Sequence, residues 1–239
     1  MEPEQESVAR QRIVRGFTWR SELLDECFPH MKAFVILLLF VATPALDEPS
    51  AHAPVHAALV EGALQQVGKT VGYDGSYQRL AYPGGDVPLE TGVCSDVLIR
   101  AYRHAGIDLQ VLVHEDMKKA FQHYPRSWGL PSPDPNIDHR RVLNLATFFR
   151  RRGTMLAVSH DPKQYRPGDI VIWRLPNGLP HIGLIAREKT DANPLVVHNI
   201  GAGAQLEDIL FAYEITGHFR YLPEMAHPTS PQTAPPARH

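Results

Sequence analysis

The chain has 239 residues, of which 44% are hydrophobic and 21% are charged, and its formal net charge is −2. This length and composition fit one globular domain with additional processed or mobile ends. The near-neutral charge and the absence of a polybasic run argue against a protein that binds nucleic acid.

Residues 1–57 have the pattern of an upstream extension followed by a secretory signal. Segment 31–58 opens with a methionine and a lysine, continues with an apolar run over 33–42 and ends in small residues, which is the order found in signal peptides. An apolar run of about ten residues is too short to span a bilayer. We therefore expect translation to begin at Met31, cleavage to follow Ala57, and an exported protein, periplasmic or extracellular, without a stable membrane span.

Removal of residues 1–57 leaves Cys94 as the single cysteine of the mature chain. A lone cysteine cannot form an internal disulfide, so a free thiol would persist in an oxidising compartment. A buried, unreactive side chain is the commoner explanation for such a cysteine. The surroundings of Cys94 therefore decide between a structural and a catalytic role.

Helical periodicity marks the first half of the mature chain. It predicts four helices, over 57–71, 94–105, 115–124 and 142–153, with a loop rich in Gly, Pro and Tyr over 72–92. The second of these helices begins at Cys94 and ends at Gly106. Cys94 is thus expected at a helix N-terminus that follows a glycine-containing turn.

The second half changes to β-rich runs separated by turn residues. Strands are predicted over 169–175, 181–187, 195–200 and 216–223. Residues 224–239 are rich in Pro, Thr, Ala and His, and we expect them to be disordered. Residues 58–223 are accordingly predicted to form one α+β domain, with helices first and a small antiparallel sheet after them.

A cysteine at a helix start and two histidines on neighbouring strands suggest nucleophilic catalysis. The positive end of a helix favours a thiolate and so lowers the pKa of the thiol. An imidazole can accept the thiol proton and return it to the leaving group. Adjacent antiparallel strands would place His181 toward Cys94 and His198 behind His181, where it would orient the ring.

Six motifs extend this pattern to a family resemblance over roughly residues 59–223. TGVCSDV, NIDHRRV, PGDIV, HIG, HNIG and TGHFRY resemble the YijF-like bacterial domain of unknown function. A cysteine at a helix start, Pro-Gly-Asp before a strand, His-Ile-Gly and a polar residue on the next strand also resemble the NlpC-type branch of the papain-like cysteine peptidases. This resemblance implies a papain-like fold, with the nucleophile at a helix start packed on the sheet, and cleavage of cell-wall peptides by a Cys-His-His site.

The residues beside the nucleophile depart from the NlpC-type pattern. That branch usually has Asp before the cysteine and Ser-Gly after it, whereas Val93 precedes Cys94 here and Ser95 and Asp96 follow it. Residues that flank the thiol help to form the binding groove. The departure therefore concerns substrate specificity more than the catalytic role.

Together these observations predict a secreted cysteine peptidase or amidase that hydrolyses amide bonds of peptidoglycan. Cys94 is the expected nucleophile, His181 the proton carrier and His198 the orienting residue. Peptidoglycan or its peptides are the expected partner, and no metal or organic cofactor is required. Transfer of the acyl group to an acceptor other than water is an open alternative for the same site.

Five further residues are candidates for substrate binding: Asp96, Asp138, His139, Arg140 and Trp173. Each also has a structural explanation. Asp138 is placed to cap the helix predicted over 142–153, His139 and Arg140 have the pattern of exposed charges, and Asp96 favours a helix N-terminus. Trp173 suits aromatic core packing.

Two other functions are compatible with the sequence. The first is a metal-dependent hydrolase that uses His181 and His198 with His139, Asp138 or His218, although no spaced ligand motif such as H-E-x-x-H is present. The second is a non-catalytic wall-binding module that has kept a peptidase fold. A lost nucleophile or base would indicate the second, and both residues are present.

Overall fold

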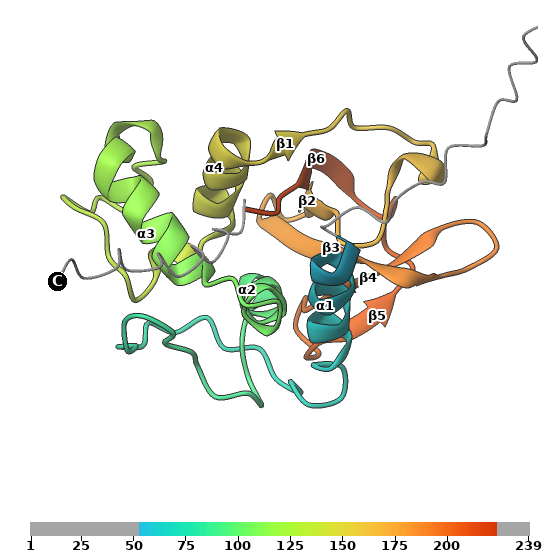
Figure 1. Cartoon of the computed structure of the whole chain (residues 1–239), viewed down its shortest axis with the longest axis horizontal. Coiled ribbons are helices and arrows are strands. Elements are labelled where there is room, and N and C mark those ends of the chain that lie inside the picture. The colour runs from blue at the N-terminus through green and yellow to red at the C-terminus, as the bar shows by residue number, and fades with distance from the viewer. Residues whose placement is uncertain (1–52, 224–239) are drawn as a thin grey trace, which may run out of the picture. The chain divides into compact units, whose positions relative to one another are not determined.

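The computed structural model describes residues 53–223, which begin with the helical part of the domain. This part holds helices α1 (Ala53–Leu64), α2 (Cys94–His104), α3 (Leu109–Ala120) and α4 (Val142–Arg152). Three short 3-10 helices are η1 (Phe121–His123), η2 (Asp138–Arg140) and η3 (Pro162–Gln164). Figure 1 shows α1 and α2 beside each other, with α3 and α4 on the side of α2 that faces away from α1.

The strands form one antiparallel sheet. They are β1 (Thr154–Met155), β2 (Ile170–Arg174), β3 (Pro180–Lys189), β4 (Pro194–His198), β5 (Gln205–Glu207) and β6 (Glu214–Arg220). Their order in the sheet is β1-β6-β2-β3-β4-β5, so β2 to β5 form a meander and β6 returns beside β2. The predicted α+β arrangement, helices first and an antiparallel sheet second, is confirmed.

Apolar side chains of α1, α2 and α4 cover one face of this sheet. Leu59, Leu98 and Phe149 belong to one buried cluster with Ile172 and Leu184 of the central strands. A smaller cluster lies on the opposite face, around Val171, Trp173, Ile185 and Val196. Removing this apolar surface from water is the main force that holds the helices on the sheet.

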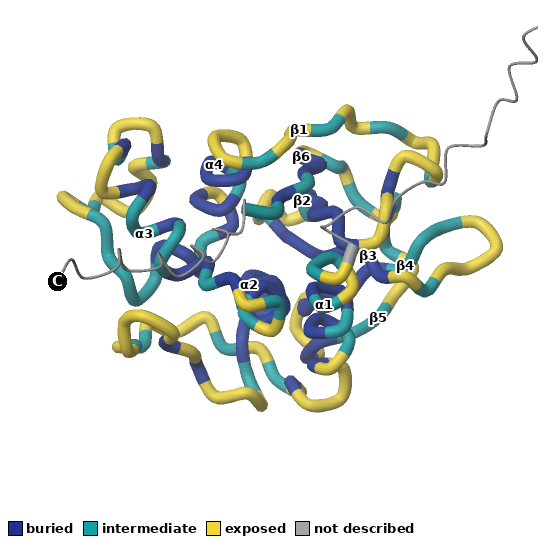
Figure 2. Tube along the Cα trace, viewed as in Figure 1, coloured by how far each residue is buried: buried dark blue, intermediate teal, exposed yellow. Residues whose placement is uncertain are grey.

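Helix α2 occupies the centre of the helical layer, and its first nine residues, Cys94 to Tyr102, are all buried. It packs against α1, β3 and β4, and Figure 2 shows it as one of the most deeply buried segments. Gly106 follows it with a φ of +79°, a left-handed conformation that glycine adopts at little cost. The start of α2 at Cys94 is therefore fixed against β3 and β4.

The bounds of two predicted helices were wrong. Helix α1 ends at Leu64 rather than near residue 71, and α3 begins at Leu109, six residues before the predicted start. The side chain of Asp108 caps α3 by accepting the backbone N–H of Gln110 at 2.9 Å, a signal that marks the true start. The short strands β1 and β5 were not predicted.

The expected signal peptide before residue 53 and the expected disordered tail over 224–239 lie outside the described residues. The expected cleavage after Ala57 falls within α1. Over residues 53–223, none of the helices is long and apolar enough to cross a membrane.

Candidate active site

Cys94 is the first residue of α2, as predicted, and it is a free, buried cysteine with 5% of its surface exposed. The turn before it is held by Asp96, whose carboxylate accepts the backbone N–H of Val93 at 2.7 Å. An acidic residue in the first helical turn also interacts favourably with the helix dipole. The local sequence therefore fixes the backbone that presents the thiol.

The expected lowering of the thiol pKa by the helix start was wrong. Burial raises the pKa of Cys94 to about 11 and outweighs the backbone amides of Ile182, Ser95 and Cys94 itself, which act to lower it. The negative charge of Asp96 adds to the increase, as a nearby like charge disfavours the thiolate. The resting thiol is therefore protonated at neutral pH.

Two imidazoles and a carboxylate form a chain across the neighbouring strands. His181 Nε2 lies 3.1 Å from His198 Nδ1, and His198 Nε2 lies 2.9 Å from an Oε2 of Glu207. Both histidines are buried, and the Trp173 ring packs against that of His181 at a centroid distance of 5.7 Å. The predicted contact between His181 and His198 is confirmed, whereas Glu207 was not anticipated.

Glu207 determines which nitrogen of each ring carries a proton. An ionised carboxylate only accepts hydrogen bonds, so His198 donates from Nε2 and, when neutral, accepts at Nδ1. His181 must then donate from Nε2, which leaves its Nδ1 unprotonated. Burial lowers the pKa of His181 to about 3 and also lowers that of His198, so both rings are neutral at pH 7 and His181 can act as a base.

Strand β3 links the hydrogen-bonded His181, His198 and Glu207 to the thiol of Cys94. Ile182, which follows His181, contributes the backbone amide that acts on the Cys94 sulfur. Over residues 53–223 no hydrogen bond joins the sulfur to the His181 ring itself. The direct contact between Cys94 and His181 stays a prediction.

A cleft of about 570 Å³ opens beside Cys94. Its walls come from the loop over 72–92, from the segment around η2 and α4, and from the residues that lead into β3. The lining includes the aromatic side chains of Tyr73, Tyr77 and Trp128 and the cationic side chains of Arg140 and Arg141. The volume is sufficient for a peptide fragment.

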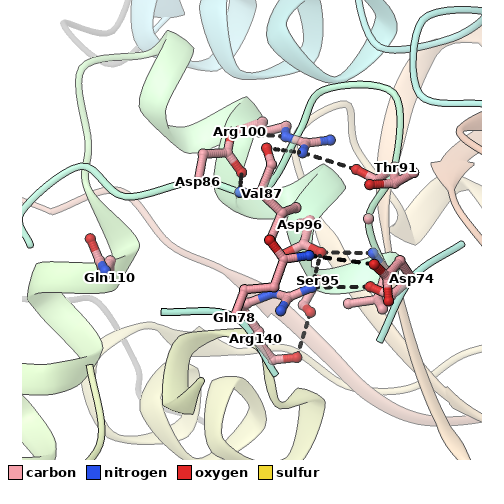
Figure 3. Close-up of polar contacts among 12 residues, drawn as sticks. Asp74, Gln78, Asp86, Val87, Thr91, Ser95, Asp96, Arg100, Gln110 and Arg140 are labelled. Atoms are coloured by element: carbon pink, nitrogen blue, oxygen red, sulfur yellow. Dashed lines mark hydrogen bonds and ion pairs between the residues drawn. The ribbon is translucent and has the colours of Figure 1, made fainter. Parts of the chain in front are cut away.

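Arg140 attaches the loop over 72–92 to the start of α2. Its guanidinium donates to both carboxylate oxygens of Asp96 at 2.8 and 2.9 Å, and to the backbone carbonyls of Ser76 and Asp74 at 3.1 and 3.2 Å. Figure 3 shows these contacts next to those of Arg100, which lie further along the same loop. Because Asp96 also holds the turn before Cys94, one ion pair supports both the cleft wall and the thiol.

The HNIG motif completes this support. Asn199 follows His198 and donates through Nδ2 to the carbonyls of Gly72 and Gly92, at 3.1 and 3.0 Å. These two glycines are the ends of the loop over 72–92. A single amide therefore joins the strand that carries His198 to both ends of the cleft wall.

Comparison with known proteins agrees with the motifs. A family model described as "Domain of unknown function (DUF1287)" matches residues 60–221. The chain belongs to the DUF1287 family. It is 56% identical over 170 residues to "Uncharacterized protein YijF" of Escherichia coli (strain K12), a match that covers 71% of this chain and 83% of that protein.

Two solved structures resemble this DUF1287 chain in fold. NlpC1 from Trichomonas vaginalis aligns with a TM-score of 0.34 at 17% identity, over 66% of this chain and 42% of that one. A protein of Staphylococcus aureus Mu50, titled as similar to a lipoprotein of the NLP/P60 family, aligns with a TM-score of 0.38 at 14% identity, over 70% of this chain and 41% of that one. The DUF1287 chain thus spans about two fifths of each structure.

The five candidate substrate-binding residues occupy different surroundings in the DUF1287 domain. Arg140 lines the cleft, whereas Asp96 and Trp173 are buried and have protein partners, Arg140 for Asp96 and the carbonyl of Leu210 for the Trp173 indole N–H at 2.9 Å. The interpretation of His139 and Arg140 as exposed charges was wrong, since only 2% and 5% of their surfaces are exposed. Substrate binding by these residues stays a prediction.

The helix-cap interpretation of Asp138 was also wrong. Arg141 precedes α4 as its N-cap residue and provides no side-chain cap. Asp138 lies in η2, where its carboxylate accepts the backbone N–H of Asp134 at 2.5 Å and a guanidinium N–H of Arg141 at 3.2 Å. Asp138 therefore orders the segment before the helix.

The donors of the metal-dependent alternative are not assembled in the described part of the DUF1287 chain. Over residues 53–223 no group of three or more His, Cys, Asp or Glu side chains has an arrangement that could hold a metal ion. His218, one suggested third ligand, instead contacts Asp169 through Nε2 at 2.9 Å and stacks on Tyr165.

Proposed function

We propose that the protein is an exported cysteine hydrolase that cleaves amide bonds in bacterial peptidoglycan. The observation that carries the proposal is the position of Cys94, at a helix start and in the wall of a peptide-sized cleft, beside the strand that begins the His181–His198–Glu207 chain. Nucleophile, base and orienting groups of this kind form the general arrangement of covalent acyl transfer.

Substrate binding starts the reaction from a neutral pair. As the Cys94 sulfur attacks the carbonyl carbon of the amide, its proton passes to Nδ1 of His181. The imidazolium then gives this proton to the departing amine while the C–N bond breaks, which leaves a thioester on Cys94. Water attacks the thioester with His181 again as base, and the carboxylic acid and the thiol are regenerated.

Backbone amides at the start of α2 are suited to stabilise the charge that develops on the carbonyl oxygen. The first N–H groups of a helix have no partner within the helix, and those of Cys94 and Ser95 lie close enough to the sulfur to affect its pKa. Fixed donors at the point where negative charge develops are a large source of rate acceleration.

Peptidoglycan and export enter the proposal through the sequence. The apolar run and small residues within 31–58 support secretion, and the motif order resembles that of enzymes that cleave cell-wall peptides. N-terminal sequencing of the protein recovered from the periplasm or the medium tests export. A chain that still begins at Met1 in the cytoplasm would contradict it.

Hydrolysis is tested by incubating the protein with purified muropeptides and measuring product masses. We expect a mass increase of one water per cleaved amide, with almost complete loss of activity in Cys94→Ala and in His181→Ala, because the two residues act as one unit. His198→Ala should retain residual activity, because His198 only orients His181. Binding without cleavage by the unchanged protein would instead support a wall-binding module.

A further inference from the structure

Arg141 stands out among the residues of the cleft by the way in which its side chain is held. Its guanidinium carbon lies 4.1 Å from the centroid of the Trp128 ring, and one N–H contacts Asp138 at 3.2 Å. The side chain is only 17% exposed. Stacking on one face and an ion pair at one edge therefore restrict the plane of the guanidinium without enclosing it.

Most of the hydrogen-bonding capacity of Arg141 is unused. Of all contacts within residues 53–223, the one to Asp138 is the sole hydrogen bond of its guanidinium, which has five N–H donors. The neighbouring Arg140 differs, because its three nitrogens already contact Asp96, Ser76 and Asp74. The donors of Arg140 are thus largely used within the protein, and Arg141 is the arginine of the cleft with unused donors.

The unused N–H donors of Arg141 favour an anionic acceptor at this position in the cleft. The lining residues of the cleft include two arginines but no aspartate or glutamate. Arg140 is paired with Asp96 at 2.8 Å, and Arg141 is paired with Asp138 at one edge only, at 3.2 Å. A planar guanidinium offers two parallel N–H groups that match the two oxygens of a carboxylate. Partial burial strengthens such a pair relative to one in open solvent.

We propose that Arg141 binds a carboxylate of the substrate and thereby selects peptides with a free acid group near the scissile amide. This inference rests on the proposed function and adds a specificity-determining residue to it. Asp138 and Trp128 act as positioning residues, since they hold the guanidinium and are not expected to contact the reacting bond.

The test compares muropeptides that have free carboxylates with the same peptides after conversion of those groups to primary amides. For the unchanged protein, we expect amidation to lower kcat/KM by about tenfold or more, in line with the loss of a charge-assisted hydrogen bond, mainly through KM. Arg141→Met should cleave both forms with similar kcat/KM, and Arg141→Lys should keep part of the preference. Arg150→Met, which removes an exposed arginine of α4, is the matched control.

A binding measurement separates this inference from the hydrolase proposal. In the Cys94→Ala background, calorimetry should show that the free-acid peptides bind more tightly than the amidated ones, and that Arg141→Met removes the difference. If the unchanged protein cleaves neither form but this binding pattern is present, the hydrolase proposal fails and the role of Arg141 stands. An acid preference that survives Arg141→Met, or no preference in the unchanged protein, would overturn the inference.

Discussion

The sulfur of Cys94 and the imidazole of His181 are both uncharged at rest, because burial raises the pKa of the thiol to about 11 and lowers that of the imidazole to about 3. A stable thiolate–imidazolium pair is therefore not present before substrate binds. In the proposed reaction, proton transfer then has to accompany attack of the sulfur on the carbonyl. At the scale of single residues, desolvation has a stronger effect on the pKa of this thiol than the backbone amides of Ile182, Ser95 and Cys94.

Alkylation measures this property directly. With iodoacetamide and no substrate, the rate of Cys94 modification should rise with pH beyond the value of about 8.5 that is typical of a free thiol, since the thiolate forms only as the pH approaches the raised pKa. The rate near pH 7 should be low and nearly the same in His181→Ala. A plateau already reached at pH 6 to 7 would show that a preformed thiolate exists.

Replacing Glu207 with Gln tests the assignment of protons in the imidazole chain. A glutamine amide can donate to His198 Nε2, which would place the His198 proton on Nδ1 and leave His181 protonated at the nitrogen that has to act as base. We expect kcat to fall by about tenfold to a hundredfold, part of the range for loss of general-base catalysis, with KM nearly unchanged.

The nitrogen-15 spectrum of the two histidines gives a readout of this variant that does not depend on turnover. The spectrum should report a change of tautomer in Glu207→Gln. It should stay unchanged in Glu214→Gln, a control at an exposed residue of β6. Glu207 is half-exposed, so the substitution should not affect folding. An unchanged spectrum would contradict the proton assignment.

At the scale of helices and strands, periodicity predicted the elements that bury a continuous apolar face. Helices α2 and α4 and the central strands β2 to β4 were located within a few residues, and with them Cys94, His181 and His198. Strands β1 and β5 have only two and three residues, too few for alternation to be visible. Glu207 was missed for this reason, since it lies on β5 and reaches His198 only through the pairing of β5 with β4.

The loop over 72–92 could not be predicted from local sequence either, because its conformation is determined by distant side chains. Arg100 donates to the carbonyls of Val87, Pro88 and Thr91 at 3.0 to 3.1 Å, and it also contacts Asp86 at 3.0 Å. These donors come from α2, outside the loop. Composition indicates only that the segment is irregular.

Substitution of Arg100 should therefore destabilise the folded conformation of the loop over 72–92. Arg100→Met would leave the buried carbonyl of Val87 and the partly buried carbonyls of Pro88 and Thr91 without this donor, and an unsatisfied buried group costs about 1–3 kcal/mol before relaxation. We expect the free energy of unfolding to fall by about 3 kcal/mol, as measured by urea denaturation, together with faster amide exchange over 72–92. Arg79→Met, at an exposed position of the same loop, should change neither quantity.

At the scale of the whole domain, buried neutral histidines link stability to pH. Burial lowers the pKa of His139 to about 4 and that of His181 to about 3. In the unfolded chain an imidazole has its ordinary pKa of about 6.5. Between these values the unfolded state binds more protons than the folded state. Stability conferred by the neutral rings is therefore complete above about pH 6.5 and is lost as the pH falls toward the folded pKa values.

Denaturation at several pH values tests this linkage. One pKa unit corresponds to about 1.4 kcal/mol, so His139 alone should cause a loss on the order of 3 kcal/mol between pH 7.5 and pH 4. His139→Asn, which removes the titrating group, should reduce the slope of stability against pH. A free energy of unfolding that stays constant or rises over this interval would contradict the burial of these rings as neutral groups.

The protonated state of Cys94 has a consequence for the durability of the protein. Peroxides and disulfides react with thiolates, and susceptibility to oxidation follows thiolate character and exposure. Cys94 is 5% exposed and holds its proton at neutral pH, so it should resist conversion to sulfenic acid or to mixed disulfides. Under the proposed export, which would remove Cys27, Cys94 would in this way survive in an oxidising compartment without a second cysteine to rescue it.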